Sequence, residues 1–447
     1  MNNSALIPNH KEYKDSGVEW LGEIPADWNL TRLKNTVHGY VNGLWGNDPN
    51  GSDELVVVRV ADFDDIRLDI SDQKLTYRSI PEKDRQGRLL NKGDLLIEKS
   101  GGGDKTLVGR VVLFDKNYPA VTSNFVAKMT PKNWVDSLYL KYVFFTLYSR
   151  GVNYASIKQT TGIQNLDTRS YLKEFFCIPE KYIQIDIANF LSKKTTQIDE
   201  AIAIKEQEIN LLRERKQIII QQAVTQGLDP NVPLKDSRVD WIGKIPEHWE
   251  VRRSKFLFTQ RKERAWKDDV QLSATQAYGV IPQEQYEELT GKRVVKIQFH
   301  LDKRKHVEKD DFVISMRSFQ GGLERAWAQG CIRSSYVVLK ALEEIDPTFY
   351  GYLLKLPSYI AALQQTASFI RDGQDLNFDN FSQVDLFIPP IREQREIANY
   401  VSSFMTSSDE GIELLLAQIE KLKEYKTTLI NSAVTGKIKI TPEMAEQ

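Results

Sequence analysis

A long segment with an apolar seam occurs twice in this chain, and it constrains the fold more than any other feature. In both copies the apolar positions recur at alternating spacings of four and three residues, which is typical of a coiled-coil face. The pattern predicts two equivalent long helices that pack on each other, each following a globular segment. The apolar seam positions are Ile198, Ile202, Ile209, Leu212, Ile219, Ile412, Leu415, Ile419, Leu422 and Leu429.

Three lysines, Lys205, Lys216 and Lys426, fall on the same seam. Lys216 and Lys426 occupy equivalent positions in the two copies, 210 residues apart. A charged residue in a seam loosens the pairing, sets its register, or receives an acidic group of a partner. The sequence alone leaves these three alternatives open.

A second repeat lies ahead of each helix. The stretch from Asp15 to Trp28, DSGVEWLGEIPADW, returns from Asp236 to Trp249 as DSRVDWIGKIPEHW. The chain is therefore a long-period duplication, in which the ends of each half agree and the middle diverges. The repeated end segments form a shared frame, and the divergent middle segments are inserts in it. The two halves are therefore expected to have related but non-identical functions.

Each half has a mixed pattern of strands and helices. In the first half, strands are predicted at 55–60, 94–97, 109–113 and 124–128, followed by a buried helix at 136–149. In the second half, strands are predicted at 294–297, 312–314 and 336–339, and a helix from Pro347. The glycine- and proline-containing stretch 226–233 ends the first long helix and links the halves.

Composition excludes several classes of protein. The 447 residues suffice for two or more domains, and the net charge of −1 excludes a generally basic shell. Any nucleic-acid contact must therefore come from local patches or from partner subunits. Two cysteines, a polar amino terminus and the lack of a long apolar run favour a reducing, cytoplasmic location.

No catalytic motif stands out. The loop 98–106 is rich in glycine, but Asp104 rather than glycine precedes Lys105, and a strand is predicted after it. A glycine-rich hairpin loop is therefore a better interpretation than a nucleotide-binding loop. The counterpart 315–322 also follows a strand, and contact with phosphate or base and a plain solvated turn are open alternatives for both loops. His300 and His306 lie in a charged run, where a solvated face is expected, and the five histidines lack metal-ligand spacing.

What remains is recognition chemistry. Arginine and lysine read guanine, and glutamine and asparagine read adenine, through paired hydrogen bonds in the major groove. Side chains of these types gather around the two glycine-containing loops, the polar stretch 160–165 and the basic run 261–267. The candidate DNA-binding residues are Lys99, Lys105, Arg110, Lys158, Gln164, Asn165, Arg169, Arg261, Lys262, Arg264, Arg317, Gln320, Arg325, Arg333, Arg371 and Gln374.

The ordered set of repeated boxes resembles the DNA specificity subunits of Type I restriction–modification systems. The resemblance rests on the duplicated Trp-Leu/Ile-Gly-x-Ile-Pro-x-x-Trp box, on IREQREI at 391–397, and on the helix ends AVTQG at 223–227 and AVTG at 433–436. It extends from about Asp15 to Lys437. The first copy departs from the pattern at Glu180 to Gln184, EKYIQ, a change that affects a subunit contact if it has a consequence.

The resemblance implies an α+β fold with a pseudo-twofold internal repeat. Two mixed α/β target-recognition domains, at 1–180 and 236–390, are separated by two long helices that form an antiparallel coiled coil. The central spacer helix and linker occupy 181–235, and the second spacer helix lies within 391–447.

The resemblance also implies a non-enzymatic function. Each domain would read one half of a bipartite, asymmetric target in double-stranded DNA. Two methyltransferase subunits and two restriction/translocase subunits would dock on the chain and carry S-adenosylmethionine, ATP and magnesium, so that the chain itself holds no cofactor and no metal. The competing interpretation is a duplicated coiled-coil scaffold or protein-interaction module without DNA specificity.

Overall fold

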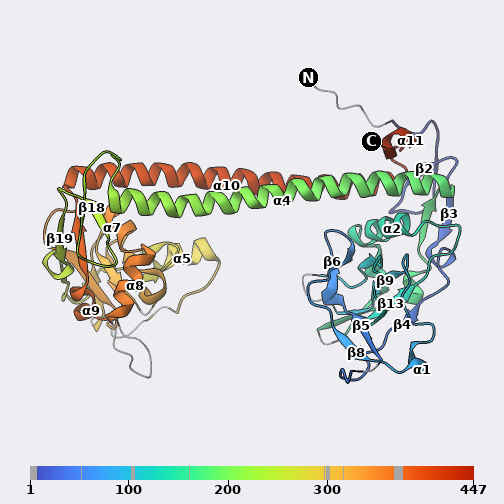
Figure 1. The fold of residues 1–447 in the computed structure, drawn as a ribbon, viewed down its shortest axis with the longest axis horizontal. Helices are drawn as coiled ribbons and strands as arrows, with labels where there is room; N and C mark the ends of the chain where they lie inside the picture. The colour runs from blue at the N-terminus through green and yellow to red at the C-terminus, as the bar shows by residue number, and fades with distance from the viewer. Residues whose placement is uncertain are drawn as a thin grey trace. The chain divides into compact units, whose positions relative to one another are not determined.

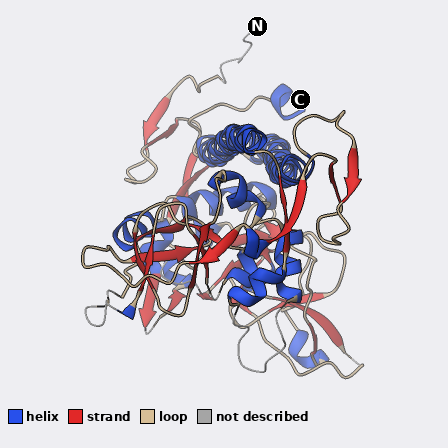
Figure 2. Ribbon diagram, turned by 90° about the vertical axis from the view of Figure 1, so that its left-hand side faces the viewer, coloured by secondary structure: helices blue, strands red, loops and turns tan. Residues whose placement is uncertain are grey.

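A computed structural model describes residues 8–51, 53–101, 106–160, 162–295, 297, 303–315, 317–366 and 376–446. The chain forms two compact units. Unit 1 comprises Met1–Gln207 and Leu415–Gln447, and unit 2 comprises Glu208–Leu414. Two long helices, α4 (Lys181–Gln226) and α10 (Ile391–Val434), each contribute residues to both units. Figures 1 and 2 show α4 and α10 side by side.

The seam residues pack between α4 and α10 within each unit. In unit 1, Ile202 and Ile419 are buried, and in unit 2, Ile209 and Ile412 are buried. The helices are antiparallel, because Asp199 lies beside Lys426 and Lys205 beside Gln418 in unit 1, while Lys216 lies beside Asp409 in unit 2. The fold is thus α+β with an antiparallel coiled-coil arrangement, as expected from the sequence.

All three seam lysines bind polar groups across the helix pair. Lys426 Nζ lies 2.7 Å from Asp199 Oδ1 and 2.7 Å from the carbonyl oxygen of Ile66. Lys216 pairs with Asp409, which is the equivalent pair of the repeat with the roles of the helices exchanged. Because each pair forms in one alignment only, the geometry favours register setting among the three alternatives.

Unit 1 is built on a four-stranded sheet in the order β11-β9-β13-β4. A second sheet has the order β12-β5-β8, and helix α2 (Ser137–Ser149) packs against β11. Strands β3 (Asn29–Arg32) and β16 (Phe175–Ile178) pair at the base of α4. The bounds of the other sheet strands are β4 Val41–Asn42, β5 Glu54–Val58, β8 Tyr77–Ser79, β9 Leu95–Glu98, β11 Val111–Leu113, β12 Ala120–Thr122 and β13 Val126–Met129.

Unit 2 repeats this frame. Its four-stranded sheet has the order β20-β27-β24-β25, and α7 (Pro347–Leu353) takes the place of α2. Strands β19 (Glu250–Arg253) and β28 (Asp385–Ile388) pair as β3 and β16 do. The remaining elements include β20 Phe258–Gln260, β21 Leu272–Thr275, β22 Gly279–Pro282, α5 Gln283–Thr290, β23 Lys305–Val307, β24 Phe312–Ile314, α6 Ser318–Gly321, β25 Glu324–Arg325, β26 Gly330–Ile332, β27 Val337–Ala341, α8 Pro357–Gln365 and α9 Phe378–Gln383.

The repeat extends to individual hydrogen bonds. In unit 1, Gln184 Nε2 donates to the carbonyl oxygen of Pro179 (2.9 Å), and its Oε1 accepts from the backbone N–H of Asp136 (2.9 Å). In unit 2, Gln394 makes the same two bonds to Pro389 and Asp346, each 2.8 Å long. Each glutamine thereby joins the first turn of a long helix to the N-cap of the buried helix α2 or α7.

The strands and helices predicted from the sequence are present with one exception. The strand expected at 294–297 does not form over the described residues 292–295 and 297. The apolar side chains of this run do not enter the core, since Val295 is 86% exposed. A short apolar run predicts a strand only where a neighbouring strand can pair with it.

Candidate nucleic-acid interface

In unit 1 the structure brings together two of the regions selected from the sequence. The start of the glycine-rich loop forms β10 (Ser100–Gly101), which pairs with β15 (Ile163–Leu166). β15 in turn pairs with β14 (Ile157–Thr160), so that the loop and the polar stretch 160–165 belong to one three-stranded sheet. Lys105 lies outside the described residues.

Two candidates of unit 1 have internal structural partners. Arg110 lies 2.8 Å from the fully buried Glu98 and 2.5 Å from Asp65, which ties β11 to β9. Gln164 is buried, and its Oε1 accepts from the backbone N–H of Val108 (3.1 Å). These contacts orient both side chains into the domain, so neither is well placed to reach a base.

The other candidates of unit 1 lie nearer the surface. Asn165 and Arg169 are exposed, and Lys158 is largely exposed beside Asp167, at 3.0 Å. Lys99 is half-buried and donates to Asn42 Oδ1 (2.6 Å), and this burial lowers the pKa of its ammonium group. The exposed side chains of β14, β15 and α3 (Thr168–Tyr171) form the more accessible polar surface.

Unit 2 also separates structural from accessible candidates. Arg261 is buried and pairs with Asp311 at 2.6 Å. Arg325 pairs with Asp310 at 2.6 Å and lies over the ring of Trp327, 4.3 Å from its centroid. Lys262, Arg264, Arg317, Gln320 and Arg333 are exposed, while Arg371 and Gln374 lie outside the described residues.

One expectation about the charged run was wrong. His306 is fully buried rather than solvated; its Nδ1 lies 2.8 Å from Asp269 Oδ2, and its ring stacks on Trp266 with centroids 3.8 Å apart. The run forms β23, whose pairing with β26 turns His306 toward the interior. His300 lies outside the described residues.

A basic cavity of unit 2 was missed by the sequence analysis, apart from Arg333. It has a volume of about 520 Å³, and four cations line it: Lys292, Arg293, Arg304 and Arg333. No carboxylate lines it among the described residues, and Arg304 Nε is buried without a hydrogen-bond partner there. Such a cavity suits a phosphate group, because several cations reach it and its described lining holds no acidic group that would neutralise them.

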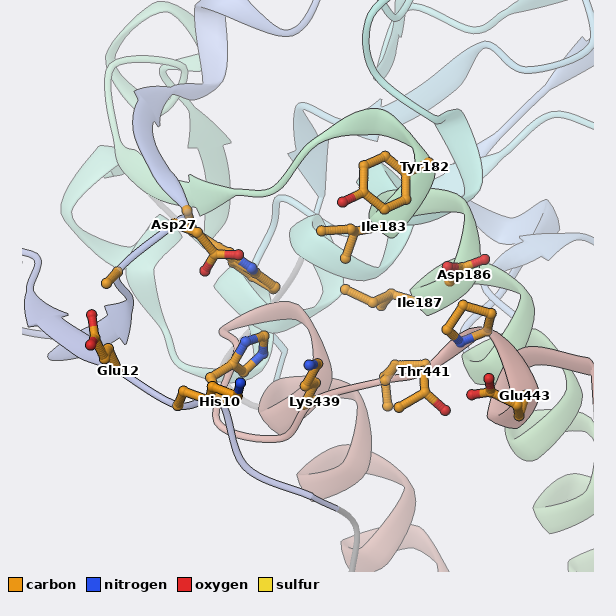
Figure 3. Close-up of a pocket in the computed structure, with 15 residues that line it drawn as sticks. His10, Glu12, Asp27, Tyr182, Ile183, Asp186, Ile187, Lys439, Thr441 and Glu443 are labelled. Atoms are coloured by element: carbon orange, nitrogen blue, oxygen red, sulfur yellow. The ribbon is translucent and has the colours of Figure 1, made fainter.

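The two units differ where the first copy departs from the repeated box. In unit 2, the carboxylate of Glu393 in the first turn of α10 accepts from the buried Trp249 Nε1 (2.9 Å) and lies 2.6 Å from His248 Nε2. In unit 1, Ile183 holds the equivalent position, and Trp28 Nε1 is buried without a partner among the described residues. Figure 3 shows Ile183, His10 and Asp27 around a cavity of about 620 Å³ at this place.

Comparison with known proteins agrees with the duplicated frame. Residues 246–421 match the family described as "Type I restriction modification DNA specificity domain". The chain is 24% identical over 458 residues to the putative type I restriction enzyme MjaX specificity subunit of Methanocaldococcus jannaschii, covering 97% of this chain and 99% of that protein. It is 23% identical over 369 residues to the MjaVIII specificity subunit of the same organism, covering 79% and 80%.

Solved structures show the same fold. A chain from a study titled as the structural basis of complex assembly and conformational transition of the type I R-M system gives a TM-score of 0.63 at 13% identity, covering 92% of this chain and 98% of that chain. The HsdS subunit of Thermoanaerobacter tengcongensis gives 0.54 at 13% identity, covering 93% and 98%.

The fold therefore defines a duplicated protein in which two mixed α/β regions are joined through a pair of long helices. The comparisons confirm the resemblance: the chain is similar over nearly its whole length to a type I restriction enzyme specificity subunit, and its residues 246–421 match the DNA specificity domain of Type I restriction–modification systems. Among the residues that the structure describes, no helix combines the length and apolar character needed to cross a membrane.

Proposed function

We propose that this chain is the sequence-reading subunit of a Type I restriction–modification complex. Its two domains, 1–180 and 236–390, each read one half of a bipartite asymmetric target, and the α4–α10 pair sets the spacing between the halves. The chain is not itself an enzyme. Methyltransferase and restriction subunits, two of each, dock on it in the cytoplasm and supply S-adenosylmethionine, ATP and magnesium.

The basic cavity of unit 2 is the observation that carries DNA contact. Lys292, Arg293 and Arg333 are exposed around it, whereas the net charge of the whole chain is −1. A nearly neutral protein gains phosphate affinity only where cations gather without neighbouring carboxylates. Phosphate contacts position such a protein on the duplex, and exposed polar side chains such as Asn165 and Gln320 are left to read bases.

The test of DNA contact is a salt titration of duplex binding by the chain together with its methyltransferase partner. The R293A/R333A variant is expected to reduce the slope of log K against log salt by about 2, since each lost phosphate contact contributes about 1. The R392A/R395A variant removes two exposed cations from α10 and is the matched control. An unchanged slope for R293A/R333A, or no duplex binding by the wild-type complex, would favour the scaffold interpretation.

The spacer role has a separate test. Removal of one heptad from both helices is expected to alter the number of unread base pairs between the half-sites, or to abolish methylation, while each half-sequence preference persists. A helix rises about 1.5 Å per residue, so seven residues change its length by about 10 Å. Sequencing of methylated DNA reads both parts of the target, and altered half-sites with unchanged spacing would refute the role.

A further inference from the structure

Unit 2 contains a buried carboxylate, paired with a partly exposed lysine, at a place where unit 1 is apolar. β24 pairs with β25 as β9 pairs with β11, which makes Glu324 the counterpart of Val112. The N-caps Asp346 and Asp136 align α7 with α2, and the same offset sets Lys355, just beyond the end of α7, against Phe145 within α2. Glu324 is 2% exposed and Val112 is 1% exposed, so a carboxylate replaces a core valine in one and the same frame.

The charge is not needed for folding, because the first copy builds the same sheet and helix without it. Burying a carboxylate is costly unless its partners are complete, and an apolar pair of similar size is often at least as stable. Here the partners are incomplete. Glu324 Oε2 lies 2.7 Å from Lys355 Nζ, but Oε1 has no hydrogen-bond partner among the described residues. Burial raises the pKa of Glu324, an effect that Lys355 opposes.

Glu324 lines a cavity of about 570 Å³ between α5, β25 and α7. Gly351 opens this cavity: a Cβ atom there would meet no atom within 4 Å, whereas the equivalent residue of unit 1 is the buried Lys141. Trp327 and Tyr278 line its apolar side and are 51% and 40% exposed. The volume lies in the range of small-molecule sites.

We propose that this cavity binds a nucleotide, with the base against Trp327 and Tyr278 and an N–H group of the base donating to Glu324 Oε1. The proposal goes beyond the reading of duplex DNA, because the cavity would take a single base rather than the edge of a base pair.

The chemistry of the walls matches the two parts of a nucleotide. Aromatic side chains stack on any base, and a carboxylate oxygen accepts from the amino or imino N–H groups that bases carry. Lys355 and Arg325 are the two cations of the lining; each pairs with one carboxylate, Glu324 and Asp310, and each keeps further N–H groups that can donate to a phosphate. Arg325 already covers one face of Trp327, which holds the indole in place.

The experiment is calorimetric titration of the full chain with dAMP, dCMP, dGMP and dTMP, with inorganic phosphate as a separate probe. At least one nucleotide is expected to bind with a Kd of about 1 mM or tighter. The E324V/K355F variant, which places the residues of unit 1 at these two positions, and the cavity-filling G351L variant are each expected to weaken binding at least about tenfold, the effect of losing one good interaction.

The control is G411L, because Gly411 of α10 also has no atom within 4 Å of an added Cβ but lies outside the cavity. Circular dichroism and the thermal midpoint report whether each variant folds. The inference is overturned if wild type binds no nucleotide, if E324V/K355F and G351L are both folded and bind as well as wild type, or if inorganic phosphate alone binds as tightly as the nucleotides.

Single-stranded and duplex oligonucleotides identify the source of the base. If E324V/K355F and G351L lose binding of both oligonucleotides and nucleotides, the base that enters the cavity belongs to DNA. If they lose nucleotide binding alone, the ligand is a free nucleotide. Both outcomes support the site. Target methylation by the assembled wild-type complex is measured separately. Absence of methylation would refute the proposed function. The nucleotide titration would still show whether the cavity binds a nucleotide.

Discussion

Glu393 offers the sharpest test of how the long helices are anchored. Its carboxylate accepts from Trp249 Nε1 and lies beside His248 Nε2, at 2.9 and 2.6 Å. Trp249 is fully buried. Replacement by isoleucine, the residue of the first copy at this place, would leave a buried indole N–H without its acceptor. We expect E393I to lower the free energy of unfolding of unit 2.

The magnitude follows from the two interactions that E393I removes. Leaving a buried donor unsatisfied costs about 1–3 kcal/mol. Glu393 also lies in the first turn of α10, where a negative charge contributes about 0.3–1 kcal/mol. The expected total is about 2–3 kcal/mol. E393Q retains an acceptor for the indole and loses only the charge, so its expected cost is about 1 kcal/mol.

Urea unfolding followed by tryptophan fluorescence measures these differences, with separate fits if the two units unfold in separate transitions. E396I is the matched control, since Glu396 is exposed, forms an ion pair with Arg392, and undergoes the same change of residue type. If E393I costs no more than E396I, or if E393Q costs as much as E393I, the hydrogen bond to Trp249 is not what stabilises the junction.

The reverse change in unit 1 and three other substitutions give further predictions. I183E is expected to stabilise unit 1 by about 1 kcal/mol, because its carboxylate would accept from Trp28 Nε1; the same substitution made in W28F, which lacks the donor, is expected to give no gain. K426A is expected to lower the free energy of unfolding by about 2–3 kcal/mol, because it leaves the carboxylate of Asp199, which is 17% exposed, without its cation. K216A is expected to lower it by less than about 1 kcal/mol, because its partner Asp409 is 55% exposed. Equal losses would contradict a role for burial. Burial lowers the pKa of Lys141 to about 8, so the unfolded chain holds this proton more tightly and stability rises between about pH 8 and 10.5. K141M is therefore expected to be more stable than wild type at pH 7 by roughly 2–3 kcal/mol, and a difference that does not shrink at pH 9.5 would refute the effect.

The sequence predicted the helices because their evidence is local and periodic. The seam from Ile198 to Ile219 and its copy from Ile412 to Leu429 need only one chain segment each to be recognised. The partners of the seam lysines could not be predicted in the same way. Pairing of Lys426 with Asp199 depends on antiparallel alignment of segments 227 residues apart.

The candidate interface was harder to predict, because the sequence does not distinguish a charged side chain that contacts DNA from one that pairs with a buried carboxylate. Arg110 was selected as a DNA contact, but strand pairing places it against Glu98. Arg304 was overlooked, because the charged run at 299–309 suggested a solvated face. Its place in the basic cavity depends on β23 pairing with β26, a contact between distant parts of the sequence.

The duplication itself separates frame from function. Where both copies keep a residue with the same bonds, as at Gln184 and Gln394, the residue stabilises the shared frame. Where one copy places a charge at a position that the other fills with a hydrocarbon, the frame does not require that charge. Glu324 of unit 2 occupies the position that Val112 occupies in unit 1, and we interpret this added charge as part of a site. Ile183 of unit 1 occupies the position of Glu393 in unit 2, and unit 1 therefore lacks the hydrogen bond that Glu393 makes. The two substitutions have opposite effects on hydrogen bonding. Glu324 adds an unsatisfied acceptor to a core that forms without it in unit 1, whereas Ile183 removes the acceptor that the buried N–H group of Trp28 requires.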